Sequence, residues 1–181
     1  RVSMIPKRSI DKSSAASLVP IPLTRHRNLT TYASSLFALG VFGIYLSTLC
    51  PTVYLGDSGE LTAAAFALGI PHNSGYPLYV HLGKLFSLLP LGHVAYRLNL
   101  MSAAFAVLTV WLVFSFIRKR TDSFISAFVA ASSLAFAPVF WSQTVCAEVY
   151  TLHTFFVAVL FRLLWAWDEK QTFTRLALLA L

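Results

Sequence analysis

Residues 31–50 read TYASSLFALGVFGIYLSTLC and contain no charged side chain. Twenty residues in a helix span about 30 Å, which is the thickness of the hydrocarbon core of a bilayer. Pro51 follows directly and cannot continue the helix, because it lacks an amide hydrogen and its ring clashes with the preceding turn. This stretch therefore predicts a helix that crosses a membrane.

The rest of the chain has the composition of a membrane protein. Hydrophobic residues make up 57% of the 181 residues and charged residues 12%, about half the share typical of a soluble domain. Further spans are predicted over residues 98–117, 124–143 and 149–167, and a fifth begins at 174–181. The predicted fold class is all-α, a polytopic transmembrane helix bundle over residues 31–181. Because the fifth apolar run is too short to cross a bilayer, we expect the chain to be truncated at its C-terminus.

The basic residues indicate the orientation of this bundle. Residues 1–30 hold six Lys and Arg against one acid, and are predicted to form a flexible basic cytoplasmic tail. Five more Lys and Arg follow the second and fourth predicted spans, whereas the loop at 51–97 holds two. The positive-inside rule places the N-terminus in the cytoplasm and this loop on the external or luminal side. The net charge of +7 is then explained by membrane lipid rather than by nucleic acid. We expect the endoplasmic reticulum membrane in a eukaryote and the plasma (inner) membrane in a bacterium.

The loop at 51–97 is predicted to fold as two short helices lying in the membrane interface. Residues 61–70 are mostly small and apolar, and residues 80–90 have an amphipathic pattern. The turn at 71–79 joins them and contains two prolines, a histidine and two tyrosines. A loop of this length is uncommon unless it is functional.

Asp57 and Glu60 are the first acids of this loop, in the sequence Gly56-Asp57-Ser58-Gly59-Glu60. Their spacing places both carboxylates on one face of a first helical turn. In one interpretation Asp57 caps the helix and the helix dipole favours Glu60. In the other the pair is catalytic, and the flanking glycines let the backbone approach a ligand closely. The spacing alone leaves both interpretations open.

Three basic side chains of the loop are candidates for binding substrate. His72 can serve as a base, a donor to phosphate or a metal ligand, or can simply bond the backbone of the turn. Lys84 and Arg97 are the two cations of the loop, and either can bind a phosphate group. The alternative for both is that they extend to lipid head groups.

Between the third and fourth predicted spans, Glu148 is an acid at the mouth of an apolar helix pair. It needs a partner or water there, or it caps the fourth span. His153 lies about one turn deeper in that span. Asn99 and Ser102 at the start of the second span are expected to form hydrogen bonds between helices.

Several enzyme classes have no basis in this sequence. It contains no phosphate-binding loop, dinucleotide fingerprint, zinc-spaced cluster of Cys and His, or serine nucleophile elbow. Cys50 and Cys146 are too few for a disulfide framework. No metal site is predicted and no cofactor is required, although a divalent metal is compatible with the sequence.

Four sequence blocks, in order, carry a resemblance to a known family. They are residues 56–61 (GDSGEL), 68–78 (LGIPHNSGYPL), 95–100 (AYRLNL) and 140–150 (FWSQTVCAEVY). These blocks resemble the domain-of-unknown-function 2723 family, which includes the eukaryotic transmembrane protein 260 type of protein O-mannosyltransferase. The family usually reads His-Pro-Pro-Gly-Tyr-Pro, whereas this chain keeps only His, Gly, Tyr and the last Pro. The match extends over about residues 40–167.

The resemblance implies the N-terminal part of a GT-C type membrane glycosyltransferase. Such enzymes transfer a sugar, here expected to be mannose, from a polyprenyl- or dolichyl-phosphate carrier to a protein hydroxyl on the luminal or external side. The expected partners are therefore a lipid-linked sugar donor, a protein acceptor and membrane lipid. By this resemblance Asp57 is the leading catalytic residue, with Glu60 beside it. The residues expected to bind the donor phosphate or substrate are His72, Tyr76, Lys84, Arg97 and Glu148.

General chemistry agrees with this expectation. A glycosyl transfer needs a carboxylate that takes the proton of the acceptor hydroxyl, here Asp57, and a group that stabilises the leaving phosphate. We expect the chain alone to be inactive, because later spans complete the site. Two competing hypotheses are a membrane transporter and a non-catalytic membrane scaffold. A transporter is expected to have charged residues within its spans and helices broken midway. Within the predicted spans Arg162 is the charged residue, near one end, and Pro138 is a helix breaker near the outer end of its span.

Overall fold

The computed structural model describes residues 23–179, with side chains from Thr31 onward. Within this range the chain forms eight helices and no strand, which confirms the all-α prediction. The helices are α1 (Leu23–Thr48), α2 (Ser58–Ala67), α3 (Pro77–Ser87), α4 (Val94–Thr121), α5 (Phe124–Ala135), α6 (Pro138–Thr144), α7 (Tyr150–Glu169) and α8 (Phe173–Leu179).

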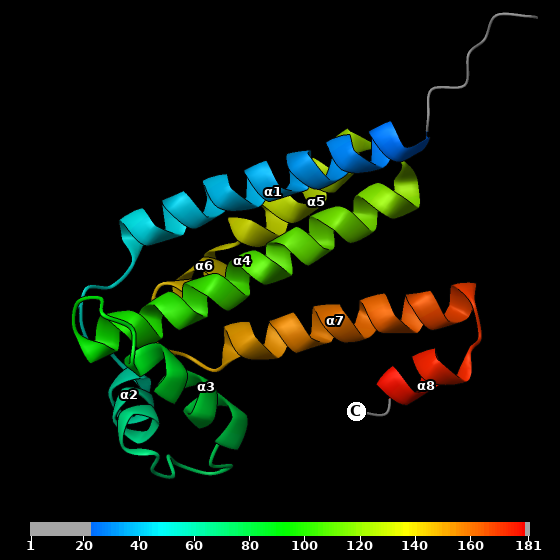
Figure 1. Ribbon diagram of the computed structural model, residues 1–181. Coiled ribbons are helices and arrows are strands. Elements are labelled where there is room, and N and C mark those ends of the chain that lie inside the picture. The colour runs from blue at the N-terminus through cyan, green and yellow to red at the C-terminus, as the bar shows by residue number, and fades with distance from the viewer. Residues whose placement is uncertain (1–22, 180–181) are drawn as a thin grey trace, which may run out of the picture.

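Three helices in the described range are long and apolar enough to cross a membrane. They are α1 over Thr31–Thr48, α4 and α7, and they coincide with three of the predicted spans, which stay predictions. The central helix α4 packs against α1 and α5 on one side and against α7 on the other (Figure 1). Small buried residues of α4 and α5, such as Ala106 and Ala131, allow these helices to approach closely. The short α8 coincides with the predicted start of a fifth span and packs against α7.

The predicted third span, 124–143, is wrong as a continuous helix. It is divided into α5 and α6, which are bent by 65° at the break. Pro138 causes the break, because proline has no amide hydrogen for the helix and forces Ala137 into an extended conformation. The hydroxyl of Tyr45 on α1 donates to the carbonyl of Ala135 at 2.7 Å, which satisfies an acceptor at the end of α5. The pair forms either a broken span or a re-entrant segment.

The predicted boundary of the N-terminal tail at residue 30 is also wrong. Helix α1 begins at Leu23, eight residues before the predicted span. Pro20 and Pro22 are the last helix breakers in the sequence before α1, so a helix can start directly after them. The prediction of a flexible tail over the preceding residues lies outside the described part of the chain.

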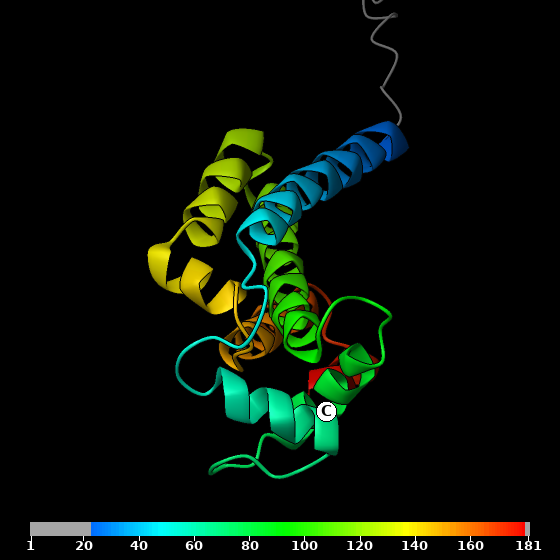
Figure 2. The ribbon, with the colours of Figure 1, turned by 90° about the vertical axis from the view of Figure 1, so that its left-hand side faces the viewer.

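The two short helices predicted in the loop at 51–97 are confirmed as α2 and α3. They lie together at the end of the bundle where α1 ends and α4 and α7 begin; Figure 2 views the molecule from this end. A Cβ atom added to Gly83 of α3 would lie 2.7 Å from side-chain atoms of both Ala65 on α2 and Leu98 on α4. Glycine at this position therefore permits the close contact that fixes α2 and α3 against the start of α4.

Candidate functional site

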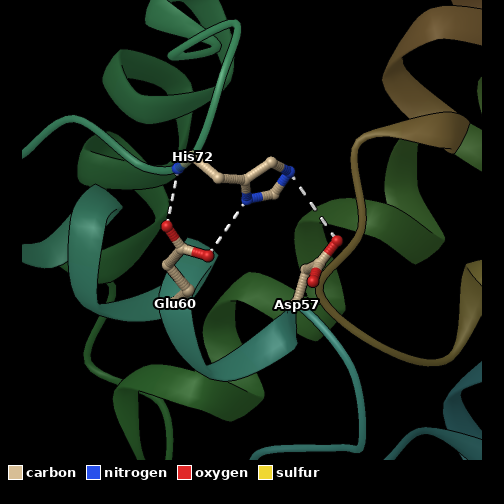
Figure 3. A group of neighbouring side chains, drawn as sticks. All are labelled: Asp57, Glu60 and His72. Atoms are coloured by element: carbon tan, nitrogen blue, oxygen red, sulfur yellow. Dashed lines mark hydrogen bonds and ion pairs between the residues drawn. The ribbon is translucent and has the colours of Figure 1, made fainter.

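A cluster of two carboxylates and one imidazole forms at the start of α2 (Figure 3). The carboxylate of Glu60 accepts a hydrogen bond from the backbone N–H of His72 at 2.6 Å and lies 3.0 Å from its Nδ1. The other ring nitrogen, Nε2, lies 3.7 Å from Oδ2 of Asp57. A single imidazole therefore stands between the two acids that the sequence singled out.

The carboxylate of Asp57 is not used to cap α2. Asp57 occupies the N-cap position, but its backbone is in the helical region and its side chain makes no capping hydrogen bond. Its backbone carbonyl instead accepts from the amide of Leu61 at 2.9 Å. The side chain is 58% exposed. The capping interpretation is therefore wrong, and the carboxylate remains available to a ligand.

The acids of this region have opposite pKa shifts. Hydrogen bonds from the side chain and backbone of His72 hold the pKa of Glu60 below its usual value, so Glu60 stays ionised. Burial raises the pKa of Glu148, and the negative charge of Asp57 raises it further. Glu148 therefore lies within electrostatic reach of Asp57. Acids whose environments move their pKa values apart are suited to different roles in proton transfer.

Two side chains of α4 hold the loops that carry these acids. Asn99 is fully buried, and its amide donates to the carbonyls of Cys50 at 2.7 Å and Thr52 at 2.9 Å. Ser102, one turn later, accepts from the backbone N–H of Glu148 at 3.3 Å. The expected hydrogen bonds thus connect α4 to the loops rather than to neighbouring helices. The two loops are also joined directly, because the N–H of Cys50 donates to the carbonyl of Val145 at 2.9 Å.

Tyr76 connects the cluster to a cavity. Its ring packs edge-on against the ring of His72, with centroids 5.4 Å apart, and its hydroxyl oxygen lies 3.5 Å from Nε2. The same tyrosine lines a cavity of about 560 Å³ between residues 74–79 and the start of α7. The cluster is therefore open to solvent and also borders an open hollow on the surface of the bundle.

The structure does not bring Lys84 or Arg97 to this cluster. The ammonium of Lys84 donates to the carbonyl of Phe66 at 2.6 Å, at the far end of α2, and lies over the ring of Phe66. The guanidinium of Arg97 donates to three backbone carbonyls within residues 87–92, at 2.5 to 2.9 Å. Both cations hold the loop together, so their placement does not support the predicted contact with a donor phosphate.

Asp57, Glu60 and His72 have the geometry to hold a divalent cation. One ligand atom from each lies within 4.8 Å of the other two. Ligands on a shared ion at about 2.1 Å are separated by at most about 4.2 Å, so small side-chain rotations would complete such a site. The hydrogen bonds of His72 also account for the arrangement without an ion. The predicted absence of a metal site therefore stays a prediction.

The structural roles of Tyr79 and Asn99 were not identified from the sequence. Tyr79 is 2% exposed, and its hydroxyl has no hydrogen-bond partner among the described residues, although it lies within electrostatic reach of Glu148. The sequence placed Tyr79 in the turn at 71–79 and gave no signal that its hydroxyl would be buried near Glu148. Asn99 was expected to join helices, and its role as a support for the loop before Asp57 needed the three-dimensional path of that loop. Cys50 and Cys146 both have free thiols.

The sequence is similar to a known family profile and to two named relatives. Residues 57–180 match the family profile described as the protein O-mannosyl-transferase TMEM260 N-terminal domain. The chain is 35% identical over 130 residues to the protein O-mannosyl-transferase TMEM260 of Mus musculus, a match covering 71% of this chain and 18% of the relative. It is 30% identical over 120 residues to the protein O-mannosyl-transferase tmem260 of Dictyostelium discoideum, covering 65% and 15%. The chain thus spans less than a fifth of the length of these relatives. No solved structure matches it.

Proposed function

Because the chain belongs to the family of the protein O-mannosyl-transferase TMEM260 N-terminal domain, we propose that it is the N-terminal part of a membrane glycosyltransferase. The reaction moves a mannose from a polyprenyl- or dolichyl-phosphate carrier to a protein hydroxyl on the luminal or external side. The hydroxyl oxygen bonds to the anomeric carbon, the bond from that carbon to the phosphate oxygen breaks, and the lipid phosphate leaves. Asp57 accepts the proton that the hydroxyl loses.

The observation that carries this proposal is the uncapped, exposed carboxylate of Asp57 beside the Glu60–His72 pair. An acceptor hydroxyl can reach Asp57 from solvent. Glu60 is held ionised by His72, and it fixes the imidazole next to Asp57. General-base catalysis of this kind contributes about 10² to 10⁴ in rate. The proposed reaction requires no cofactor, and a divalent cation at the cluster is compatible with it.

The position of the cluster supports a donor that is carried by a lipid. The cluster lies at the end of the bundle where one candidate span ends and two others begin. An isoprenoid phosphate held in a bilayer can reach such a position laterally. The basic residues support the proposed side of the membrane, since the cluster at the start of α2 lies at the opposite end of the bundle from Arg118, Lys119 and Arg120 in the last turn of α4.

The test uses the full-length protein in membranes, labelled polyprenyl-phosphate mannose and a set of candidate protein acceptors. We expect Asp57→Asn to lower kcat at least 100-fold, because the amide cannot accept the proton. The matched control is Asp122→Asn. Asp122 is 97% exposed and pairs with Arg118, at the opposite end of α4. The control should retain the wild-type rate.

The outcomes separate the competing hypotheses. If both variants transfer mannose at the wild-type rate, Asp57 is not the base, and Glu60 and Glu148 are tested next. If the wild-type protein transfers no sugar from any lipid-linked donor, the glycosyltransferase proposal fails and transport is measured instead. A rate that falls equally in both variants would indicate a general loss of folding. A parallel assay with EDTA tests whether a metal takes part.

A further inference from the structure

His153 has no role in the proposed reaction, although it is an ionisable residue inside a candidate span. It lies in α7, three residues after the helix begins at Tyr150, and its side chain is exposed. Ionisable residues within membrane spans are costly and usually functional. His153 lines the cavity of about 560 Å³ that also borders Tyr76. The question is what this cavity binds.

The cavity has the size and chemistry of a small-molecule site. Binding pockets usually measure about 300–1,000 Å³ and combine apolar walls with a few polar groups. Residues 150, 153 and 156 of α7 follow helical spacing, so Tyr150, His153 and Phe156 form one wall. Tyr76 and Tyr79 contribute to the opposite wall. The lining includes one imidazole and no carboxylate, while the acid Glu148 lies beside it and bonds the backbone N–H of the lining residue Val149.

Two helices begin at the walls of this cavity. Pro77 is the first residue of α3 and Tyr150 the first residue of α7, and both line the cavity. Neither N-cap residue makes a side-chain capping hydrogen bond, and the carboxyl group of Glu148 bonds the backbone N–H of Val149, directly before α7. The first-turn amides and the positive ends of the helix dipoles favour a bound anion such as phosphate. His153 adds a hydrogen-bond donor one turn along α7.

The cavity also has access to lipid and to the acid cluster. Its α7 wall belongs to a candidate span, so an isoprenoid chain in the bilayer can lie along Leu152 and Phe156. Tyr76 lines the cavity on one side and contacts His72 on the other. A phosphate in the cavity would therefore direct its attached sugar toward the acid cluster.

We propose that this cavity binds the head of an isoprenoid phosphate, with the phosphate against His153 and the start of α7. The first isoprene unit lies against Leu152 and Phe156. This assignment rests on the proposed function, because it places the donor of the same reaction. It assigns the phosphate to His153 rather than to Lys84 or Arg97.

The test measures binding separately from transfer. The full-length protein in detergent is titrated with farnesyl phosphate by calorimetry, and with farnesol, inorganic phosphate and phosphatidylglycerol as comparison probes. His153→Ala should weaken farnesyl phosphate binding about tenfold or more, since it removes a hydrogen bond to a charged group. His93→Ala is the matched control. It removes an exposed imidazole at the start of α4 that makes no capping bond and does not line the cavity.

Phe156→Ala provides a second variant that leaves the phosphate contact intact. We expect it to weaken farnesyl phosphate binding but not binding of inorganic phosphate. In the transfer assay, His153→Gln should raise KM for the lipid donor with a smaller change in kcat. Thermal unfolding of each variant checks that the protein is folded.

Several results would overturn this assignment. Equal affinity of wild type and His153→Ala for farnesyl phosphate would overturn it. So would binding of phosphatidylglycerol as tight as that of farnesyl phosphate, because that would indicate a general lipid contact. Equal affinity for inorganic phosphate and farnesyl phosphate would exclude the isoprenoid contact. If Asp57→Asn abolishes transfer while His153→Ala changes neither binding nor KM, this assignment fails and the proposed function stands. If farnesyl phosphate binds through His153 but no sugar is transferred, the cavity assignment stands and the proposed function fails.

Discussion

Replacing Asn99 by alanine should release the loop that leads to Asp57. Asn99 is fully buried and donates to the carbonyls of Cys50 and Thr52 at 2.7 and 2.9 Å. Each bond contributes about 1 kcal/mol, and because Cys50 is half-buried and Thr52 exposed, the loss of a donor costs each carbonyl less than the roughly 1–3 kcal/mol of a fully buried group. Removal of the unpartnered Oδ1 of Asn99 itself recovers part of this cost. We therefore expect Asn99→Ala to destabilise the loop by about 2–3 kcal/mol.

Hydrogen–deuterium exchange on the full-length protein measures this effect locally. A loss of about 2–3 kcal/mol corresponds to amide exchange about 30- to 150-fold faster in residues 49–58. Thr109→Ala is the matched control, because Thr109 is a buried polar residue of the same helix whose hydroxyl bonds the carbonyl of Phe105 within that helix. The control should leave exchange in residues 49–58 close to the wild-type rate. Unchanged exchange in Asn99→Ala, or an equal increase in both variants, would refute the view that Asn99 supports this loop.

Two further predictions concern Arg97 and Glu148, the first away from the cluster and the second within electrostatic reach of Asp57. Arg97→Gln should lower the free energy of unfolding by about 1–3 kcal/mol, because it removes hydrogen bonds to three carbonyls. It should leave KM for the lipid donor unchanged. A raised KM with unchanged stability would instead indicate that Arg97 binds the donor phosphate. Glu148 has a raised pKa in the folded protein, so its contribution to stability is complete below the unfolded pKa and is lost as pH rises through the folded value. In a series of unfolding measurements at rising pH, the free energy of unfolding of the wild-type protein should fall, and Glu148→Gln should lack this fall. An equal fall in both proteins would contradict the view that Glu148 causes it.

The spans were predictable because they depend on composition. Stretches such as residues 31–50 exclude charge over the length of a bilayer, and no tertiary contact is needed to identify them. The break at Pro138 was visible in the sequence, but its consequence depended on where the carbonyls at the end of α5 find donors. Tyr45, 90 residues earlier in the chain, supplies one of these donors. The helical start at Leu23 was missed because basic residues were taken as the end of the ordered region.

The candidate site was predictable only in its local part. Asp57 and Glu60 share a helical turn, so their proximity follows from spacing, and His72 was a candidate from its turn. The contact between His72 and Glu60 depends on the path by which the turn folds back along α2. The sequence did not predict that these two side chains would pair. The partners of Lys84 and Arg97 were also hidden, because backbone carbonyls are present everywhere and leave no mark in a sequence.

The electrostatics of this end of the bundle separate the two halves of the proposed reaction. Within the described part of the loop at 51–97, the ammonium of Lys84 and the guanidinium of Arg97 are both occupied by carbonyls, so His72 is the basic group that contacts the acid cluster. A phosphate placed against two carboxylates there would be repelled, whereas an approaching hydroxyl would find a proton acceptor. The start of α7 differs, because it combines first-turn amides, an imidazole and a cavity lining without carboxylates, and because burial raises the pKa of Glu148, the acid that precedes it. Tyr76 borders both environments. The acceptor is therefore expected on the Asp57 side of Tyr76 and the lipid phosphate on the His153 side, with the sugar between them.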